Sequence, residues 1–259
     1  MKTYKGYLID LDGTMYRGTE QIEAASEFVD TLVKNNIPYL FVTNNSSQTP
    51  EKVAKKLMDF QIQATKETVF TTSQATANYI YEKKKDAKVY VIGEEGLKEA
   101  ITNRGLTFVE ENPDFVVTGI DREITYEKLA KACIAVRNGA TFISTNADIA
   151  LPTERGLLPG NGALTSVVTV STNTQPIFIG KPEAIIVEQA LQVLGTEKSE
   201  TLMVGDNYDT DIKAGINCGL DTLLVHTGVT TKQHLKNYSI QPTYTVESLA
   251  EYIQHGFNS

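Results

Sequence analysis

The chain has 259 residues, enough for one large domain or two modest ones with a sizeable buried core. Its apolar share of 41% and charged share of 22% are typical of a soluble globular protein. The net charge of −8 argues against a nucleic-acid or anionic-membrane partner, because both need a basic surface. No apolar run is long enough to cross a bilayer and no signal-peptide pattern is present, so we expect a cytoplasmic location.

The first predicted element is a short apolar strand, Tyr7 to Ile9, of the kind buried on both faces of a parallel sheet. Asp10 stands where this strand ends, Asp12 follows, and Gly13 lets the chain turn away. In open α/β sheets this position is the ligand crevice. Two close carboxylates repel each other there, so they need a cation or a shared proton. Taken alone, the stretch could also be an Asp-Gly turn with an incidental second acid.

Helices and strands alternate along the rest of the chain. Apolar residues at helical spacing predict helices at 22–35, 50–60, 73–84, 95–103, 126–138, 163–170, 180–194 and 246–255. Short apolar runs predict strands at 37–42, 69–72, 89–92, 115–118, 141–144, 177–179, 201–204 and 223–225. Ser73 is expected to cap its helix. Residues 146–162 are expected to be irregular, and loops of that length are usually functional.

The polar strand ends near residues 10, 43 and 206 lie on both sides of a central α/β series. If they belong to one sheet, the middle segment is an insertion that folds as its own domain over the strand ends. We therefore predict an α/β protein with a doubly wound, Rossmann-like core on a parallel sheet. The core is assigned to residues 1–82 and 179–259, and the inserted α/β domain to residues 83–178.

The residues at these strand ends point to one kind of chemistry. Carboxylate oxygens suit Mg²⁺, which takes one or two side-chain carboxylates together with substrate phosphate. Hydroxyl, amide and ammonium groups suit phosphate oxygens, so the combination favours phosphoryl transfer. The residues concerned are Asp10, Asp12, Asp206, Asp211, Thr43, Asn44 and Lys181.

Other metal chemistry has little support in the sequence. Cys133 and Cys218 have no CxxC pattern or histidine neighbour, so both are interpreted as buried free thiols. The three histidines show no ligand spacing, and zinc is therefore not expected.

These motifs closely resemble those of haloacid dehalogenase-superfamily phosphatases, in the order of that family. They are DLDGT at 10–14, TNN at 43–45, Lys181, and GDN at 205–207 with Asp211. The α/β insertion between the second and third motifs is similar to the type IIA cap domain of NagD-like and p-nitrophenyl phosphatases. The resemblance spans nearly the whole chain, from Lys5 to about Val229.

The resemblance implies a role for each matching residue. Asp10 would be the nucleophile that forms an aspartyl-phosphate, and Asp12 the general acid and then base. Mg²⁺ would be held by Asp10, the backbone carbonyl of Asp12, and Asp206, with Asp211 either a direct ligand or a supporting residue. An alternative for Asp211 is that it only favours the N-terminal turn of its helix.

The resemblance also assigns the phosphoryl oxygens to Thr43, Asn44, Asn45 and Lys181. Asn45 could instead orient its loop without touching the ligand. Taken alone, Lys181 could be only an exposed helix start.

In the inserted domain, Asn146 and Asp148 are the foremost candidates for contacting the leaving group of the substrate. A structural loop held by Asx turns explains the same residues equally well. Contacts of this domain could also make a homodimer, although no apolar stripe requires one.

The sequence thus favours a Mg²⁺-dependent phosphatase acting on a small phosphorylated metabolite, such as a nucleotide or a sugar phosphate. The alternatives are a phosphotransferase that uses the same intermediate and a catalytically silent module that binds a phosphate ligand. A sugar-nucleotide transferase also uses a DxD pair, but that interpretation leaves Thr43, Lys181 and Asp206 unexplained.

Overall fold

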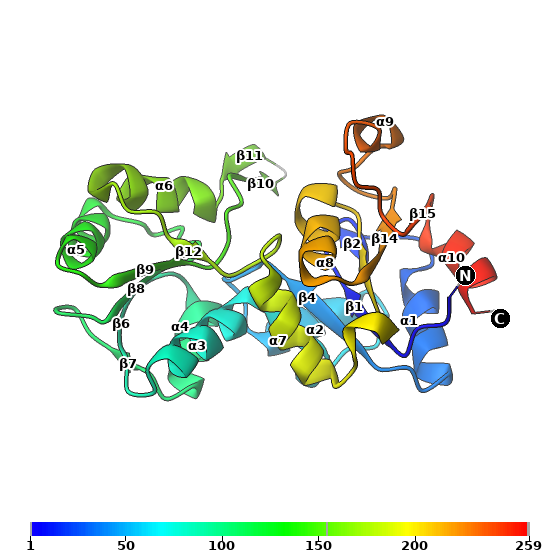
Figure 1. Ribbon diagram of the computed structural model, residues 1–259, viewed down its shortest axis with the longest axis horizontal. Helices are drawn as coiled ribbons and strands as arrows, with labels where there is room; N and C mark the ends of the chain where they lie inside the picture. The colour runs from blue at the N-terminus through cyan, green and yellow to red at the C-terminus, as the bar shows by residue number, and fades with distance from the viewer. Residues whose placement is uncertain (1, 154, 258–259) are drawn as a thin grey trace. The chain divides into compact units, whose positions relative to one another are not determined.

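The computed structural model describes residues 2–153 and 155–257. The chain forms two compact units, each built on a parallel sheet with helices (Figure 1). Unit 1 comprises Met1–Thr43, Glu51–Phe70 and Lys181–Ser259, and unit 2 comprises Asn44–Pro50 and Thr71–Gly180. The α/β class with a Rossmann-like parallel sheet is therefore confirmed.

The central element of unit 1 is a six-stranded parallel sheet in the order β15-β14-β13-β1-β4-β5. Its strands are β1 (Gly6–Ile9), β4 (Tyr39–Thr43), β5 (Val69–Thr71), β13 (Thr201–Gly205), β14 (Asp221–Val225) and β15 (Tyr244–Val246). The accompanying helices are α1 (Ala25–Lys34), α2 (Pro50–Asp59), α7 (Ala184–Leu194), α8 (Lys213–Cys218), α9 (Lys232–Leu235) and α10 (Leu249–Gly256). A two-stranded ribbon of β2 (Tyr16–Arg17) and β3 (Glu20–Gln21) follows β1.

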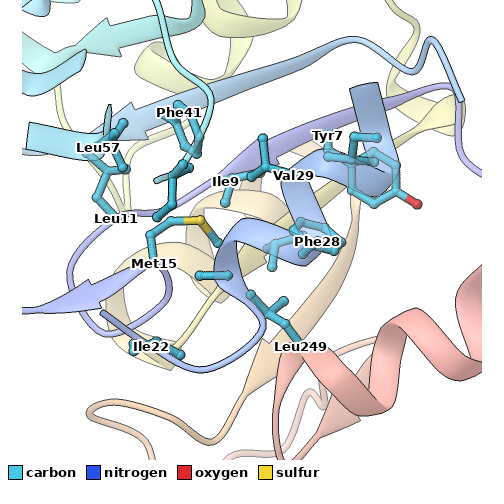
Figure 2. Close-up of a cluster of buried hydrophobic side chains, with 14 of the residues drawn as sticks. Tyr7, Ile9, Leu11, Met15, Ile22, Phe28, Val29, Phe41, Leu57 and Leu249 are labelled. Carbon is cyan, nitrogen blue, oxygen red and sulfur yellow. The ribbon is translucent and has the colours of Figure 1, made fainter. Parts of the chain in front are cut away.

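Both faces of this sheet are buried because its strands are apolar on both sides. On one face, Ile9 of β1 packs in a cluster with Phe28 of α1, Leu57 of α2 and Leu249 of α10 (Figure 2). On the other face, α7 packs on β1 and β4, and α8 packs on β14. The sheet is thus doubly wound, and the residues that follow its strands emerge at one edge.

Unit 2 holds a five-stranded parallel sheet in the order β12-β9-β8-β6-β7. Its strands are β6 (Lys88–Ile92), β7 (Thr107–Phe108), β8 (Phe115–Thr118), β9 (Thr141–Ser144) and β12 (Ile177–Phe178). Helices α5 (Tyr126–Arg137) and α6 (Asn161–Thr172) cover one face, and α3 (Thr72–Lys83) and α4 (Glu95–Asn103) lie on the other (Figure 1).

The contacts place the start of unit 2 earlier than residue 83. The hydroxyl of Ser73, on α3, donates to the backbone carbonyl of Ser46 at 3.0 Å. The backbone N–H of Gly96, on α4, donates to the carbonyl of Ser47 at 3.0 Å. Helix α3 and the loop 44–50 therefore belong with the second sheet, although the sequence pattern groups them with the first.

Several local predictions are wrong, and each error has a physical cause. Residues 146–162 contain a hairpin of β10 (Ala150–Thr153) and β11 (Gly156–Pro159) instead of an irregular loop. Its strands are short and contain prolines, so they lack the pattern of a buried strand. Helix α3 is capped by Thr71, whose hydroxyl accepts from the Gln74 N–H at 3.2 Å, and not by Ser73. Val246 belongs to β15, because it pairs with Val225 of β14.

Within residues 2–153 and 155–257, no helix is both long and apolar enough to span a membrane.

Candidate active site

The loop after β1 carries the first candidate residues of the site. The backbone N–H of Asp10 donates to the carbonyl of Val204 at 2.9 Å, so Asp10 lies where β1 and β13 both end. Gly13 has a φ of 92°, and a Cβ at this position would collide with the carboxylate of Asp206. Only glycine therefore lets the loop turn this closely over the end of β13.

Three carboxylates from two separate strand ends meet at this edge. Asp10 follows β1, Asp206 follows β13, and Asp211 lies in the π-helical turn Tyr208–Ile212. Each offers an oxygen within 4.8 Å of the others. Asp206 and Asp211 are buried and Asp10 is partly buried, so little water is available to screen their repulsion.

Lys181 supplies the positive charge of this cluster. Its side chain is 1% exposed and donates to the carboxylates of Asp10 and Asp211, the latter at 2.7 Å. The ammonium group also donates to the backbone carbonyl of Val42 at 3.0 Å. Burial lowers the pKa of Lys181, but the charges of Asp10 and Asp211 outweigh it and raise the pKa above its ordinary value. Lys181 therefore stays charged, and the interpretation as an exposed helix start is wrong.

The carboxylates are not fully compensated by this one lysine. Burial and then the charge of Asp211 raise the pKa of Asp10 well above its ordinary value, although Lys181 opposes the shift. The same two causes raise the pKa of Asp206 to about 7, although the N–H of Val229 donates to its carboxylate at 2.7 Å. If all three acids were ionised, the cluster with its one lysine would carry a net charge of −2, which explains why the two pKa values are raised. A divalent cation with oxygen ligands fits this donor set.

Asp12 lies beside this cluster, two residues after Asp10. Among the described residues the three clustered carboxylates do not include that of Asp12. Burial raises the pKa of Asp12, while Lys56 and the backbone N–H of Gly18 partly offset the shift. A raised pKa suits a group that must donate a proton near neutral pH.

The second motif follows β4, which pairs with β1 in register Ile9 to Phe41. Thr43 is the buried last residue of β4, directly after the Val42 carbonyl that Lys181 contacts. Asn44 follows it and already belongs to unit 2. The side-chain oxygen of Asn45 accepts from the backbone N–H of Ser47 at 2.8 Å, so Asn45 orients its loop.

Asn146 and Asp148 of unit 2 lie against Asn44. The side-chain amide of Asn146 donates to the backbone carbonyl of Asn44 at 2.8 Å. Its side-chain oxygen accepts from the Asp148 N–H at 3.1 Å, which is the Asx turn that the sequence left open. The amide of Asn44 lies 3.4 Å from both carboxylate oxygens of Asp148.

Sequence reasoning missed two residues that support the carboxylates. The Thr14 hydroxyl lies 3.3 Å from Asp206 and 3.5 Å from Asp10. A Cβ at Gly228 would collide with the carboxylate of Asp206, so the loop after β14 also packs on it. Thr14 belongs to the DLDGT stretch and could have been selected there, whereas no sequence signal marks Gly228.

Comparisons with known proteins agree on one family. The model described as haloacid dehalogenase-like hydrolase matches residues 7–107, and a HAD-hydrolase-like model matches residues 178–252. The 5'-nucleotidase YutF of Bacillus subtilis is 69% identical over 98% of this chain and 100% of its own. The acid sugar phosphatase of Staphylococcus aureus is 56% identical over 98% of both chains.

Solved structures give the same result. The p-nitrophenyl phosphatase from Archaeoglobus fulgidus has a TM-score of 0.93 at 33% identity, covering 98% of this chain and 99% of its own. A mutant of the thermostable p-nitrophenylphosphatase from Bacillus stearothermophilus has a TM-score of 0.89 at 63% identity, covering 97% of this chain and 98% of its own. The chain therefore belongs to the haloacid dehalogenase-like hydrolases. Within that family it is a phosphatase, as the sequence motifs predicted.

Proposed function

We propose that this phosphatase hydrolyses small phosphomonoesters with Mg²⁺ and an aspartyl-phosphate intermediate on Asp10. The observation that carries the proposal is the buried group of Asp10, Asp206 and Asp211 around Lys181. In this group one carboxylate is available for attack and the others can hold a cation beside it. The names of relatives, a 5'-nucleotidase and an acid sugar phosphatase, support nucleotides or sugar phosphates as the substrate class.

The reaction would proceed in two displacements at phosphorus. A carboxylate oxygen of Asp10 forms a bond to phosphorus while the bond to the leaving oxygen breaks, and Asp12 gives its proton to the departing alkoxide. A water molecule then attacks the same phosphorus and gives its proton to Asp12. The bond to Asp10 breaks, inorganic phosphate leaves, and both aspartates return to their first state.

Mg²⁺ would be held by Asp10, Asp206, Asp211 and the backbone carbonyl of Asp12. When bound, it supplies positive charge that offsets the repulsion between these carboxylates and a phosphate dianion. Lys181 adds a fixed charge next to Asp10, and its burial keeps that charge unscreened.

Thr43, Asn44 and Asn45 are proposed to bind the phosphoryl oxygens together with Lys181. The position of Thr43 at the end of β4, beside the carbonyl that Lys181 contacts, supports this assignment. Asn45 would act through its backbone, because its side-chain oxygen is engaged in the turn.

In unit 2, Asp148 and Asn146 are proposed to act at the leaving group, Asp148 by contact and Asn146 by holding the loop. Their hydrogen bonds to Asn44 support this, since Asn44 is covalently joined to Thr43. A cap role for the inserted domain, a cytoplasmic location, an optional homodimer and the lack of a nucleic-acid partner stay predictions.

The deciding experiment measures phosphate release from nucleoside monophosphates, sugar phosphates and p-nitrophenyl phosphate, with Mg²⁺ and with a chelator. We expect release that requires the metal and falls more than about 1,000-fold in Asp10→Asn. Asp59→Asn, on the exposed end of α2, is the matched control. A loss below about tenfold in Asp10→Asn would exclude it as the nucleophile. Transfer to an added alcohol in preference to water would identify a phosphotransferase.

A further inference from the structure

Tyr16 and Lys56 form a pair beside the loop that carries the nucleophile. The ammonium group of Lys56, on α2, lies 3.8 Å from the centre of the Tyr16 ring, a close cation–π contact. The other partner of this ring is Phe60, with ring centres 5.4 Å apart and an interplanar angle of 27°. The Tyr16 ring therefore stacks on Phe60 and contacts the ammonium group of Lys56.

Apart from the cation–π contact between them, the polar atoms of this pair have no hydrogen-bond or ion-pair partner in the described part of the chain. Tyr16 is only 7% exposed, yet no group in the described part of the chain hydrogen-bonds to its hydroxyl. In the same residues, Lys56 makes no hydrogen bond or ion pair, although its side chain is half-buried. The Tyr16 hydroxyl is not among the fully buried polar atoms without a partner, so it is open to solvent, as is the half-buried ammonium group, and both donors are accessible to a ligand.

The pair lies next to Asp12 and close to Asp10. Tyr16 bridges to Asp12 in the backbone, and its carbonyl accepts the N–H of Gly13 at 2.7 Å. Burial and then the charges of Asp12 and Asp10 raise the pKa of the Tyr16 phenol. Burial lowers the pKa of Lys56, and the charge of Asp12 opposes this. The side chains of Tyr16 and Lys56 are thus within electrostatic range of the proposed general acid.

This position corresponds to the leaving-group side of the reaction. A general acid must come within hydrogen-bond distance of the oxygen that it protonates. Groups around the Asp12 side chain are therefore near the alcohol part of the ester, whereas Lys181 contacts the Asp10 carboxylate on the phosphoryl side. Lys181 thus lies on the phosphoryl side of the site, and Lys56 lies on the leaving-group side.

We propose that Lys56 and the Tyr16 hydroxyl form a subsite for an anionic group, such as a carboxylate, on the leaving alcohol of the substrate. The inference rests on the proposed function and adds a preference among its substrates. The four aspartates at this edge would repel a second anion on the substrate, so an ester that carries one needs a cation of its own. Lys56 supplies that cation, and the hydroxyl of Tyr16, whose ring the lysine contacts, supplies a hydrogen-bond donor.

The test compares two esters with the same two-carbon chain, 2-phosphoglycolate, which ends in a carboxylate, and 2-hydroxyethyl phosphate, which ends in a neutral hydroxymethyl group. The measured quantity is the ratio of their kcat/KM values, the charged ester over the neutral one. In Lys56→Gln we expect this ratio to fall about tenfold, mainly through a higher KM for 2-phosphoglycolate. In Lys56→Arg the ratio should stay within about threefold of wild type, because the charge is kept.

Two further variants separate binding from folding effects. Lys55→Gln removes an exposed lysine one position away on the same helix, and it should keep the wild-type ratio. Tyr16→Phe keeps the ring under Lys56 but lacks the hydroxyl, and it should lower the ratio by about threefold.

An unchanged ratio in Lys56→Gln, or an equal fall in Lys55→Gln, would overturn the subsite. The proposed function has a separate readout, namely Mg²⁺-dependent hydrolysis of the neutral ester by the wild-type protein. If that reaction is absent, the proposed function fails. If it is present and the ratio does not respond to Lys56, only the subsite fails.

Discussion

The two parallel sheets of this protein present very different chemistry at the carboxyl ends of their strands. In unit 1 that edge carries Asp10 and Asp206, which Lys181 compensates only in part. In unit 2 the buried acid after β8, Asp121, is paired with Lys128 at 2.8 Å, and the strand ends beside it carry a buried network of neutral groups. The hydroxyl of Thr165, on α6, lies 2.9 Å from the hydroxyls of both Thr118 and Ser144, and all three residues are buried.

The neutral network satisfies almost all of its own hydrogen bonds. Asn161 donates to the Ser144 hydroxyl at 2.9 Å and to the Asn146 carbonyl at 2.8 Å. Within the described ranges, the side-chain oxygen of Asn161 is the one buried side-chain polar atom without a partner. The comparison shows that a sheet edge gathers polar groups for geometric reasons, and that the two edges differ in charge: one lysine faces three acids in unit 1, whereas Asp121 of unit 2 has Lys128 as its own partner.

Removing the lysine of the charged edge should have the largest effect on stability. In Lys181→Met, Asp10 and Asp211 lose their shared cation while they stay buried. We expect the free energy of unfolding in chelator to fall by about 3–5 kcal/mol, measured by urea titration. Lys198→Met, which removes a lysine from an exposed pair with Glu188, should cost less than about 0.5 kcal/mol. A similar small cost for both variants would contradict the proposed electrostatic role.

Replacing a carboxylate at the charged edge of unit 1 should weaken metal binding more than it lowers the stability of the fold. In Asp206→Ala we expect the Mg²⁺ concentration for half-maximal activity to rise by about 100-fold. The fold should persist because the substitution also removes a like charge near Asp211. Asp59→Ala serves as the exposed control. An unchanged metal titration would show that the ion is bound elsewhere.

The raised pKa of Asp206 predicts a pH dependence of metal binding. Burial and the charge of Asp211 raise this pKa to about 7, so the metal-free folded protein keeps a proton that the unfolded chain releases near pH 4. The stability of the metal-free protein should therefore fall as the pH rises from about 4 to 7. Because Mg²⁺ must displace the proton, its apparent Kd should be more than about tenfold weaker at pH 5 than at pH 7.5. Calorimetric titration at both pH values measures this, and equal Kd values would refute it.

The neutral network of unit 2 should show a smaller effect that is confined to stability. Thr165→Val keeps the shape of the side chain but leaves the hydroxyls of Thr118 and Ser144 without this partner. We expect a loss of about 1–2 kcal/mol, seen as faster hydrogen exchange in β8 and β9, with kcat within about twofold of wild type. Thr169→Val, half-buried on the same helix, is the control. A large loss of kcat would mean that the network of unit 2 also acts in the reaction.

Strong local signals made much of the fold predictable. The buried run before Asp10 forms β1, and the helix predicted at 95–103 has those bounds as α4. The hairpin at 150–159 could not be predicted in this way, because its half-exposed strands with prolines carry no periodic signal. The same applies to the membership of α3 in unit 2, which depends on contacts such as that between Ser73 and Ser46.

What the sequence alone determined was the set of candidate site residues, since the acids and Lys181 stand in recognisable motifs at strand ends. What only the tertiary structure decided was their mutual electrostatics. Asp10 and Asp206 are far apart in sequence, and the parallel pairing of β1 with β13 brings them together. The pairing of Lys56 with Tyr16 likewise depends on how α2 packs beside the loop after β1. Local patterns encode elements, whereas charge coupling depends on distance and burial, and these exist only after the chain has packed.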